Sequence, residues 1–153
     1  MAKQYWLMKS EPDVYSIDDL ERDGSTYWDG VRNYKARNNM RSMQVGDEVL
    51  YYHSNAKPPG VVGIARVCKE PYPDPTQFDK KNKYFDAKSD PNNPRWSLVD
   101  VEFVAKFSEM VSLDAVKAEA ALSEMELVRY GRLSVQEVRK AEFDHVKKMG
   151  GLK

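Results

Sequence analysis

Cysteine and histidine are scarce in this chain of 153 residues, which has one cysteine, Cys68, and two histidines, His53 and His145. A single cysteine excludes an internal disulfide framework and is typical of a protein in a reducing compartment. So few thiol and imidazole ligands also argue against a zinc centre. We therefore predict no metal and no cofactor. Cys68 ends the run VVGIARVC, which favours a half-buried strand residue over a nucleophile.

Long apolar runs are also missing. No stretch approaches the roughly 18 residues that a membrane-spanning helix needs. Polar residues interrupt the N-terminal sequence MAKQYWLMKSEPD, so it does not fit a secretory signal. These absences predict a soluble cytoplasmic protein that does not bind membranes. The length and the 41% hydrophobic content fit one compact domain over residues 1–153.

An excess of positive charge is the third absence, because 24 basic residues are balanced by 24 acidic ones. Strong unspecific binding of nucleic acid depends on neutralising phosphates, so the charge of the whole chain argues against it. Any such role must depend on local charge. Residues 31–46 supply it, since this segment has no acidic side chain and contains four basic ones, Arg32, Lys35, Arg37 and Arg41.

The pattern of apolar residues predicts strands at 5–8, 48–53, 61–67 and 96–107. Gly63 is expected to mark a bulge or the close approach of another backbone. Residues 71–94, rich in Pro, Asp, Asn and Lys, form a long surface excursion, a kind of loop that is usually functional or mobile.

Capping residues predict where the helices begin and end. Ser16 and Asp19 have capping-box spacing, with Gly24 as a stop, and Ser123 and Glu126 have the same spacing. Further helices are expected at 34–43, after Ser112, and in a terminal segment that ends at 150–151. Strands separated by long insertions, with helices at the ends, predict an α+β domain on a small mixed barrel.

The helix expected at 34–43 would place Arg37 and Arg41 one turn apart, beside an apolar stripe of Ala36, Met40 and Met43. A local basic ridge on a neutral protein fits selective phosphate contact. A solvated helix face without a binding role fits the same pattern, so both interpretations stay open.

Aromatic residues flank this ridge: Trp28, Tyr34, Tyr51 and Tyr52. Flat rings near guanidinium groups suit the stacking of an unpaired base, which contributes roughly 1–3 kcal/mol. An aromatic core is the alternative. Because strand neighbours point to opposite faces, Tyr51 and Tyr52 cannot both line one cavity.

Polar residues follow two of the expected strands. His53, Ser54 and Asn55 close one strand, and together with Asn33 they offer groups that could read a Watson–Crick edge. Ser10 follows the first strand and could contact a base edge. A structural hydrogen bond is a comparable explanation for His53 and for Ser10.

Several segments together closely resemble the EVE domain, from about residue 5 to residue 146. They are YWLMKSEP, WDGVRNYKARNNMR, GDEVLYYHSN, GVVGIARV, PYPD, PRWSLVDV and GRLSV. The resemblance implies a PUA-like fold, a mixed β pseudo-barrel with flanking helices. It also implies kinship with YTH, ASCH and SRA-type domains, which bind nucleic acid and often take a modified base into a pocket.

By the same resemblance, Trp28 looks like one wall of an aromatic cage, residues 52–54 look like the opposite side, and Ser10 is similar to a polar floor residue. Implied targets are methylated or hydroxymethylated cytosine in DNA, or a modified RNA nucleoside. The hypothesis is a non-catalytic module. Its expected base pocket comprises Ser10, Trp28, Asn33, Tyr34, Tyr52, His53, Ser54 and Asn55. Its expected phosphate contacts are Lys9, Arg32, Lys35, Arg37 and Arg41.

Two alternatives belong to other classes of function. A small hydrolase would need His53 as the base for a serine nucleophile. Ser54 directly follows His53 on an extended segment, so their side chains diverge, but Ser10 remains open. A protein-interaction adaptor would use exposed apolar anchors of the excursion. Those available are Tyr72, Phe78, Tyr84 and Phe85. The sequence does not decide between DNA and RNA, and it does not fix the oligomeric state.

Overall fold

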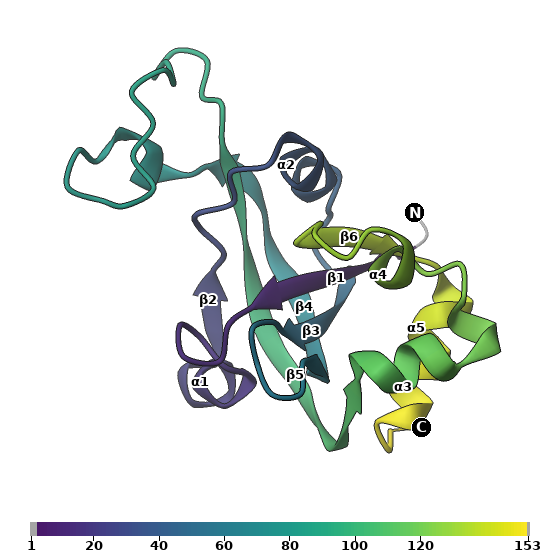
Figure 1. Ribbon diagram of the computed structural model, residues 1–153. Helices are drawn as coiled ribbons and strands as arrows, with labels where there is room; N and C mark the ends of the chain where they lie inside the picture. Colours follow the sequence, from purple (N-terminus) through teal and green to yellow (C-terminus); the bar gives the residue numbers. More distant parts are fainter. Residues whose placement is uncertain (1–2, 153) are drawn as a thin grey trace.

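The computed structural model describes residues 3–152, which form a mixed β-sheet with helices packed on both faces (Figure 1). The strand order is β2-β5-β4-β3-β1-β6. β1 and β3 are parallel, and the other neighbours are antiparallel. The strands are β1 (Tyr5–Ser10), β2 (Ser25–Tyr27), β3 (Glu48–His53), β4 (Gly60–Pro73), β5 (Ser97–Ser112) and β6 (Val135–Val138). The predicted α+β class is confirmed, with a curved, open sheet that ends in β2 and β6.

The helices divide between the two faces of the sheet. α1 (Ile17–Asp23) and α2 (Tyr34–Arg41) bury their apolar residues in one core. α3 (Leu113–Ala118), α4 (Glu126–Arg129) and α5 (Lys140–Met149) bury theirs in the other. Among the residues described, no helix has the length and apolar character required to cross a membrane.

Alternate side chains of the same strand enter different cores. In β1, Trp6 and Met8 belong to the core under α1 and α2, whereas Leu7 belongs to the core under the C-terminal helices. This follows from the twofold side-chain period of a strand. Tyr51 and Tyr52 of β3 separate in the same way, which confirms that they do not line one cavity.

Side-chain caps explain where two helices begin. Ser16 caps α1 and forms the expected capping box with Asp19, and Gly24 (φ 84°) ends this helix. Ser112 caps α3 as expected by accepting a hydrogen bond from the Ala115 amide. The burial of the expected apolar stripe is also confirmed: Ala36 and Met40 of α2 are fully buried, and Met43 is buried two residues beyond the end of the helix, which is shorter than predicted.

The capping box predicted at Ser123 is wrong. Ser123 follows the short 3-10 helix η2 (Ala120–Leu122), and α4 begins after Met125 without a side-chain cap. The Glu126 carboxylate instead accepts a hydrogen bond from the Glu137 amide in β6. A contact with a distant strand therefore replaces the local one.

β4 and β5 are longer than their apolar patterns predict. β4 continues to Pro73 and pairs there with the start of β5, and β5 continues to Ser112, which pairs with Gly60 at the start of β4. Gly63 lies at shifts of register with both neighbouring strands, which confirms the expected bulge. A Cβ at this position would lie 2.5 Å from the Ala105 carbonyl oxygen, so glycine is required by the approach of β5.

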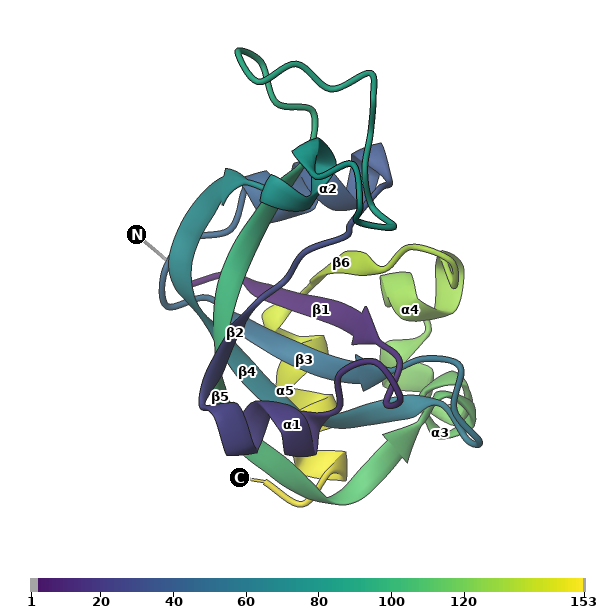
Figure 2. The ribbon, with the colours of Figure 1, turned by 90° about the vertical axis from the view of Figure 1, so that its left-hand side faces the viewer.

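The excursion, here residues 74–96, connects β4 to β5 and projects beyond α2 (Figure 2). It opens with the 3-10 helix η1 (Pro75–Phe78) and is organised around Gln77, which is fully buried. The Gln77 amide nitrogen donates to the carbonyls of Asp74 and Trp96, and its oxygen accepts from the Ser89 hydroxyl. The two ends of the excursion are thus bonded to each other.

Candidate nucleic-acid interface

The parallel pairing of β1 and β3 produces an edge at which two segments leave the sheet together. Ser10 pairs with His53, and the Ser54 amide donates to the Ser10 carbonyl at 3.0 Å. A cavity of about 940 Å³ opens beside this edge, a size that fits a small ligand or a base. Its walls come from residues 9–11, 14–15, 23, 25–32, 54, 83–84, 131–132 and 134.

Trp28 contributes to one wall and is only 9% exposed. Its ring meets Tyr51 edge to face, with the ring centroids 5.4 Å apart. Its amide donates to the Val99 carbonyl, so β5 fixes the backbone. Trp28 is therefore a rigid part of this wall, and the rings of Tyr27 and Tyr84 are more accessible.

Arg32 joins this wall to the excursion. Its guanidinium forms an ion pair with Asp74 (3.1 Å), and it also donates to the Thr76 hydroxyl and twice to the Tyr84 carbonyl. The Asp74 side chain is fully buried. Removing either partner of a buried ion pair leaves an uncompensated charge in the interior, which strongly destabilises the fold. Arg32 thus uses its planar fork of donors on the protein itself.

Tyr84 enters the cavity wall from the excursion because of this bonding. Its ring lies close to Gly30, where a Cβ would come within 2.5 Å of the ring atoms. Gly30 also has a φ of 80°, which glycine adopts without strain. The glycine of the WDGVRN motif therefore permits both the turn and the contact with Tyr84.

Two charged groups of the cavity are shifted by their surroundings. Burial lowers the pKa of the Lys9 ammonium, which donates to the Gly131 carbonyl and lies over the Tyr52 ring. Burial and the nearby Asp74 charge raise the pKa of the Asp29 carboxyl. Burial is the main cause of both shifts, because the cavity wall solvates charge less well than water does.

His53 forms a structural hydrogen bond and is not placed as a catalytic base. Its Nε2 accepts a hydrogen bond from the Ile17 amide at the start of α1. Burial lowers the pKa of His53, which favours the neutral ring that this bond requires. The imidazole therefore holds α1 against the end of β3.

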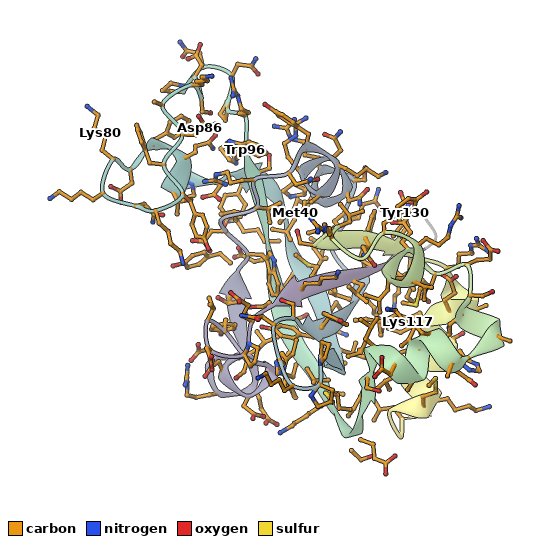
Figure 3. The ribbon with its side chains drawn as sticks, in the orientation of Figure 1. Met40, Lys80, Asp86, Trp96, Lys117 and Tyr130 are labelled. Atoms are coloured by element: carbon orange, nitrogen blue, oxygen red, sulfur yellow. The ribbon has the colours of Figure 1, made fainter. Side chains whose placement is uncertain are left out.

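The arginines of α2 hold the far end of the excursion. Arg37 donates to the Arg95 carbonyl, and Arg41 donates to the Ser97 hydroxyl and the Pro94 carbonyl. The ring of Tyr34 stacks on Trp96 at 5.0 Å, with Arg37 over the Tyr34 ring. Figure 3 shows Trp96 and Asp86 at this junction, where the Asp86 carboxylate accepts from the Trp96 indole nitrogen.

The structure brings five of the predicted site residues to the cavity: Lys9, Ser10, Trp28, Arg32 and Ser54. The others do not line it. Asn33 caps α2, Tyr34 packs on the excursion, and Tyr52 belongs to the opposite core. Asn55 donates to Glu11, and His53, Lys35, Arg37 and Arg41 also lie outside the lining.

Sequence reasoning missed the cavity residues Tyr27, Asp29 and Tyr84 and the basic residues Lys83 and Arg132. Asp29 had a signal, because it directly follows Trp28 in the WDGVRN motif. Arg132 lies in the GRLSV segment and Tyr84 is one of the aromatic residues of the excursion. Their place at the cavity, like that of Lys83, depends on loops that meet only in the folded chain.

Two of the four aromatic residues that a protein-interaction adaptor would use make contacts within the fold. The Tyr72 hydroxyl donates to Asp100 at 2.6 Å, and Tyr84 packs under Arg32. Phe78 and Phe85 are each 36% exposed. The described residues contain no cluster of three or more His, Cys, Asp or Glu side chains that could hold a metal ion.

Comparison with known proteins gives a consistent result along the chain. A rat relative, thymocyte nuclear protein 1 from Rattus norvegicus, is 44% identical over 161 residues, which cover 93% of this chain and 71% of the relative. A solved hypothetical protein from Leishmania major has a TM-score of 0.93 at 48% identity, over 97% of this chain and 95% of that one.

The human THYN1 protein has been solved in complex with DNA that contains 5-methylcytosine. Its TM-score is 0.93 at 40% identity, over 99% of both chains. The family model described as the EVE domain matches residues 4–149. This chain therefore belongs to the EVE domain family.

Proposed function

We propose that this chain is a non-catalytic nucleic-acid-binding module that holds a modified nucleobase, first of all 5-methylcytosine in DNA, in the cavity beside Trp28. The observation that carries the proposal is the cavity itself, which combines aromatic rings with hydrogen-bonding groups. Its aromatic residues are Tyr15, Tyr27, Trp28 and Tyr84. The human relative solved with 5-methylcytosine-containing DNA supports the choice of base. Modified RNA is the second candidate partner.

Binding is favoured over hydrolysis by the state of His53. A general base needs a free lone pair directed at the nucleophile. The Nε2 lone pair of His53 accepts from the Ile17 amide, and the ring does not line the cavity that contains Ser10. We therefore propose no catalytic role for Ser10. It and Ser54 instead offer hydroxyl groups to the edge of the bound base.

Phosphate contacts, in this proposal, come from cations whose donors remain available near the cavity. Lys83 and Arg132 line its mouth and form no ion pair with any residue that the structure describes. Lys9 keeps further donors beyond the one directed at Gly131. Arg37 and Arg41 are the weaker candidates, because their guanidinium groups already bind the protein.

Two predictions about the setting follow from the sequence and stay predictions. The first is a cytoplasmic location, although the name of the vertebrate relatives contains the word nuclear. The second is a single functional domain, which we infer from the family match over residues 4–149.

The test is calorimetric titration with 5-methyl-2′-deoxycytidine and with short oligonucleotides that contain 5-methylcytosine. We expect Trp28→Phe to weaken binding by about 1 kcal/mol, because the smaller ring retains part of a stacking contact that contributes roughly 1–3 kcal/mol. Phenylalanine is chosen since alanine would leave a hole beside Tyr51.

Tyr34→Ala is the matched control, because it removes an aromatic residue from the basic segment but outside the cavity. Its affinity for the nucleoside is expected to equal that of the wild type. The absence of binding to either ligand at millimolar concentration would overturn the proposed function.

A further inference from the structure

Asp29 is a carboxylate in the cavity wall that accepts no hydrogen bond from another side chain among residues 3–152. Its neighbours in the wall are engaged: Glu11 accepts from Asn55 at 2.7 Å, and Asp23 accepts from the Tyr15 hydroxyl at 2.7 Å. The hydrogen bond that acts on Asp29 comes from its own backbone. Arg32, a cation of the same wall, forms its ion pair with Asp74 instead.

The backbone on both sides of Asp29 is held in place. The Trp28 amide donates to the Val99 carbonyl at 2.9 Å, and the Gly30 amide donates to the Asp74 carboxylate at 2.8 Å. The Tyr84 ring closes against Gly30. The backbone of Asp29 is therefore in place before a ligand arrives, which lowers the entropy cost of a contact made there.

The surroundings disfavour the ionised form of the Asp29 carboxyl. Burial is the main cause that raises the pKa of Asp29, and the charge of Asp74 adds to it. The charges of Arg32 and Lys83 act in the opposite direction but contribute less. A carboxylate in this condition gains most from a ligand that donates a hydrogen bond, whereas a phosphate would be repelled.

Bases differ in whether their edges donate or accept hydrogen bonds. Cytosine carries a donor in its N4 amino group, whereas thymine carries an acceptor, O4, at the same position. An ionised carboxylate only accepts, so it fits the first edge and opposes the second. The 5-methyl group is common to 5-methylcytosine and thymine, so contacts with that group cannot tell them apart.

We propose that Asp29 accepts a hydrogen bond from the exocyclic amino group of the base held against Trp28, and that it selects 5-methylcytosine against thymine. The inference rests on the proposed function and assigns a specificity-determining residue to it. In this arrangement Trp28 supplies the apolar surface, and the adjacent residue reads the edge of the same base.

The experiment compares 5-methyl-2′-deoxycytidine with thymidine by calorimetric titration of the full chain. The wild type is expected to bind the first at least fivefold more tightly, since one good edge contact discriminates by about 1–3 kcal/mol. Asp29→Asn is expected to reduce this preference below twofold, because an amide can rotate to donate to thymine O4.

Asp29→Leu provides a second variant that keeps the approximate volume but has no polar group. It is expected to weaken binding of 5-methyl-2′-deoxycytidine at least fivefold. Glu11→Gln is the control, since it removes a charge from a wall carboxylate that has an internal partner. The preference for 5-methyl-2′-deoxycytidine should persist in this variant.

The outcomes separate this inference from the proposed function. A wild-type chain that binds neither nucleoside nor the methylated oligonucleotide overturns both. A wild-type chain that binds 5-methyl-2′-deoxycytidine, with a preference over thymidine that Asp29→Asn leaves intact, overturns the role of Asp29 alone. Loss of preference in Glu11→Gln as well as in Asp29→Asn would also overturn it, because the effect would then reflect the total charge of the wall.

Discussion

The chain has two segments rich in basic residues, but only one of them uses its positive charges to bind other parts of the protein. The first is the arginine group, defined as Arg32, Arg37 and Arg41. The second is the lysine loop, residues 80–88, with lysines at 80, 81, 83 and 88. The arginines donate to carbonyls, hydroxyls and one carboxylate at both ends of the excursion. Within residues 3–152, the four lysines form no ion pair.

The difference follows from the two side chains. A guanidinium has five donors in a fixed plane and can connect several acceptors, whereas an ammonium is a compact, strongly hydrated charge on a flexible stem. The arginine group therefore fixes the position of the excursion, and the lysine loop is the part of the excursion whose charges bind no acidic residue within residues 3–152. Figure 3 shows Lys80 at the outer end of the excursion. Positive charge in a sequence thus reveals little about whether that charge is available to a ligand.

The largest effect is expected for Arg32→Ala. This variant leaves the fully buried Asp74 carboxylate without its cation, and breaking a buried pair costs about 3–5 kcal/mol. Chemical denaturation measures the free energy of unfolding. Arg32→Lys should recover part of the loss, because it restores the charge but not the donors to Thr76 and Tyr84. A loss of less than about 1 kcal/mol for Arg32→Ala would mean that Arg32 contributes no more than a surface charge, and it would contradict the contrast between the arginine group and the lysine loop.

A smaller loss is expected for Arg41→Ala. Its bond to the Ser97 hydroxyl is partly buried and its bond to the Pro94 carbonyl is exposed, and neither involves a charged partner, so the free energy of unfolding should fall by about 1 kcal/mol. The salt dependence of DNA binding should not change, since the guanidinium is already engaged. Titrations of oligonucleotide at several salt concentrations test this. A reduced salt dependence would show that Arg41 exchanges its protein partners for phosphates.

Local patterns predicted much of the fold. The capping box at Ser16, the alternation of Tyr51 and Tyr52 and the bulge at Gly63 were all predictable, because each depends on residues close in sequence or on one strand. β2 and β6 were missed. With three and four residues, they are too short for a periodic signal, and long-range pairing defines them.

The candidate site was predictable only where it follows a strand or a motif. Ser10 ends β1, Ser54 directly follows the parallel strand β3, and Trp28 opens the motif that forms one wall. The partners of the arginine group are mostly backbone carbonyls, which leave no trace in a sequence. His53 is a similar case, because the Ile17 amide that it binds is 36 residues away. Tyr84 is held at the cavity by the bonds that Arg32 makes to its carbonyl, 52 residues away in the sequence.

The smallest effect on stability, and the clearest test of the second region, is expected for Lys80→Gln/Lys83→Gln. Neither ammonium forms an ion pair within residues 3–152, so the free energy of unfolding should stay within about 0.5 kcal/mol of the wild type. Binding of the oligonucleotide should nevertheless become less sensitive to salt. The slope of log K against log salt concentration is expected to fall by up to about 0.9 for each lysine that contacts a phosphate.

Lys117→Gln/Lys148→Gln is the matched control for this pair. It removes the same total charge from α3 and α5, and Figure 3 shows Lys117 on the other side of the molecule from Lys80. The free nucleoside carries no phosphate, so its affinity should be the same in both double variants. An equal fall of the slope in both would mean that DNA responds to net charge and not to the lysine loop. An unchanged slope in Lys80→Gln/Lys83→Gln would mean that the excursion supplies Tyr84 to the cavity but no contact with the DNA backbone.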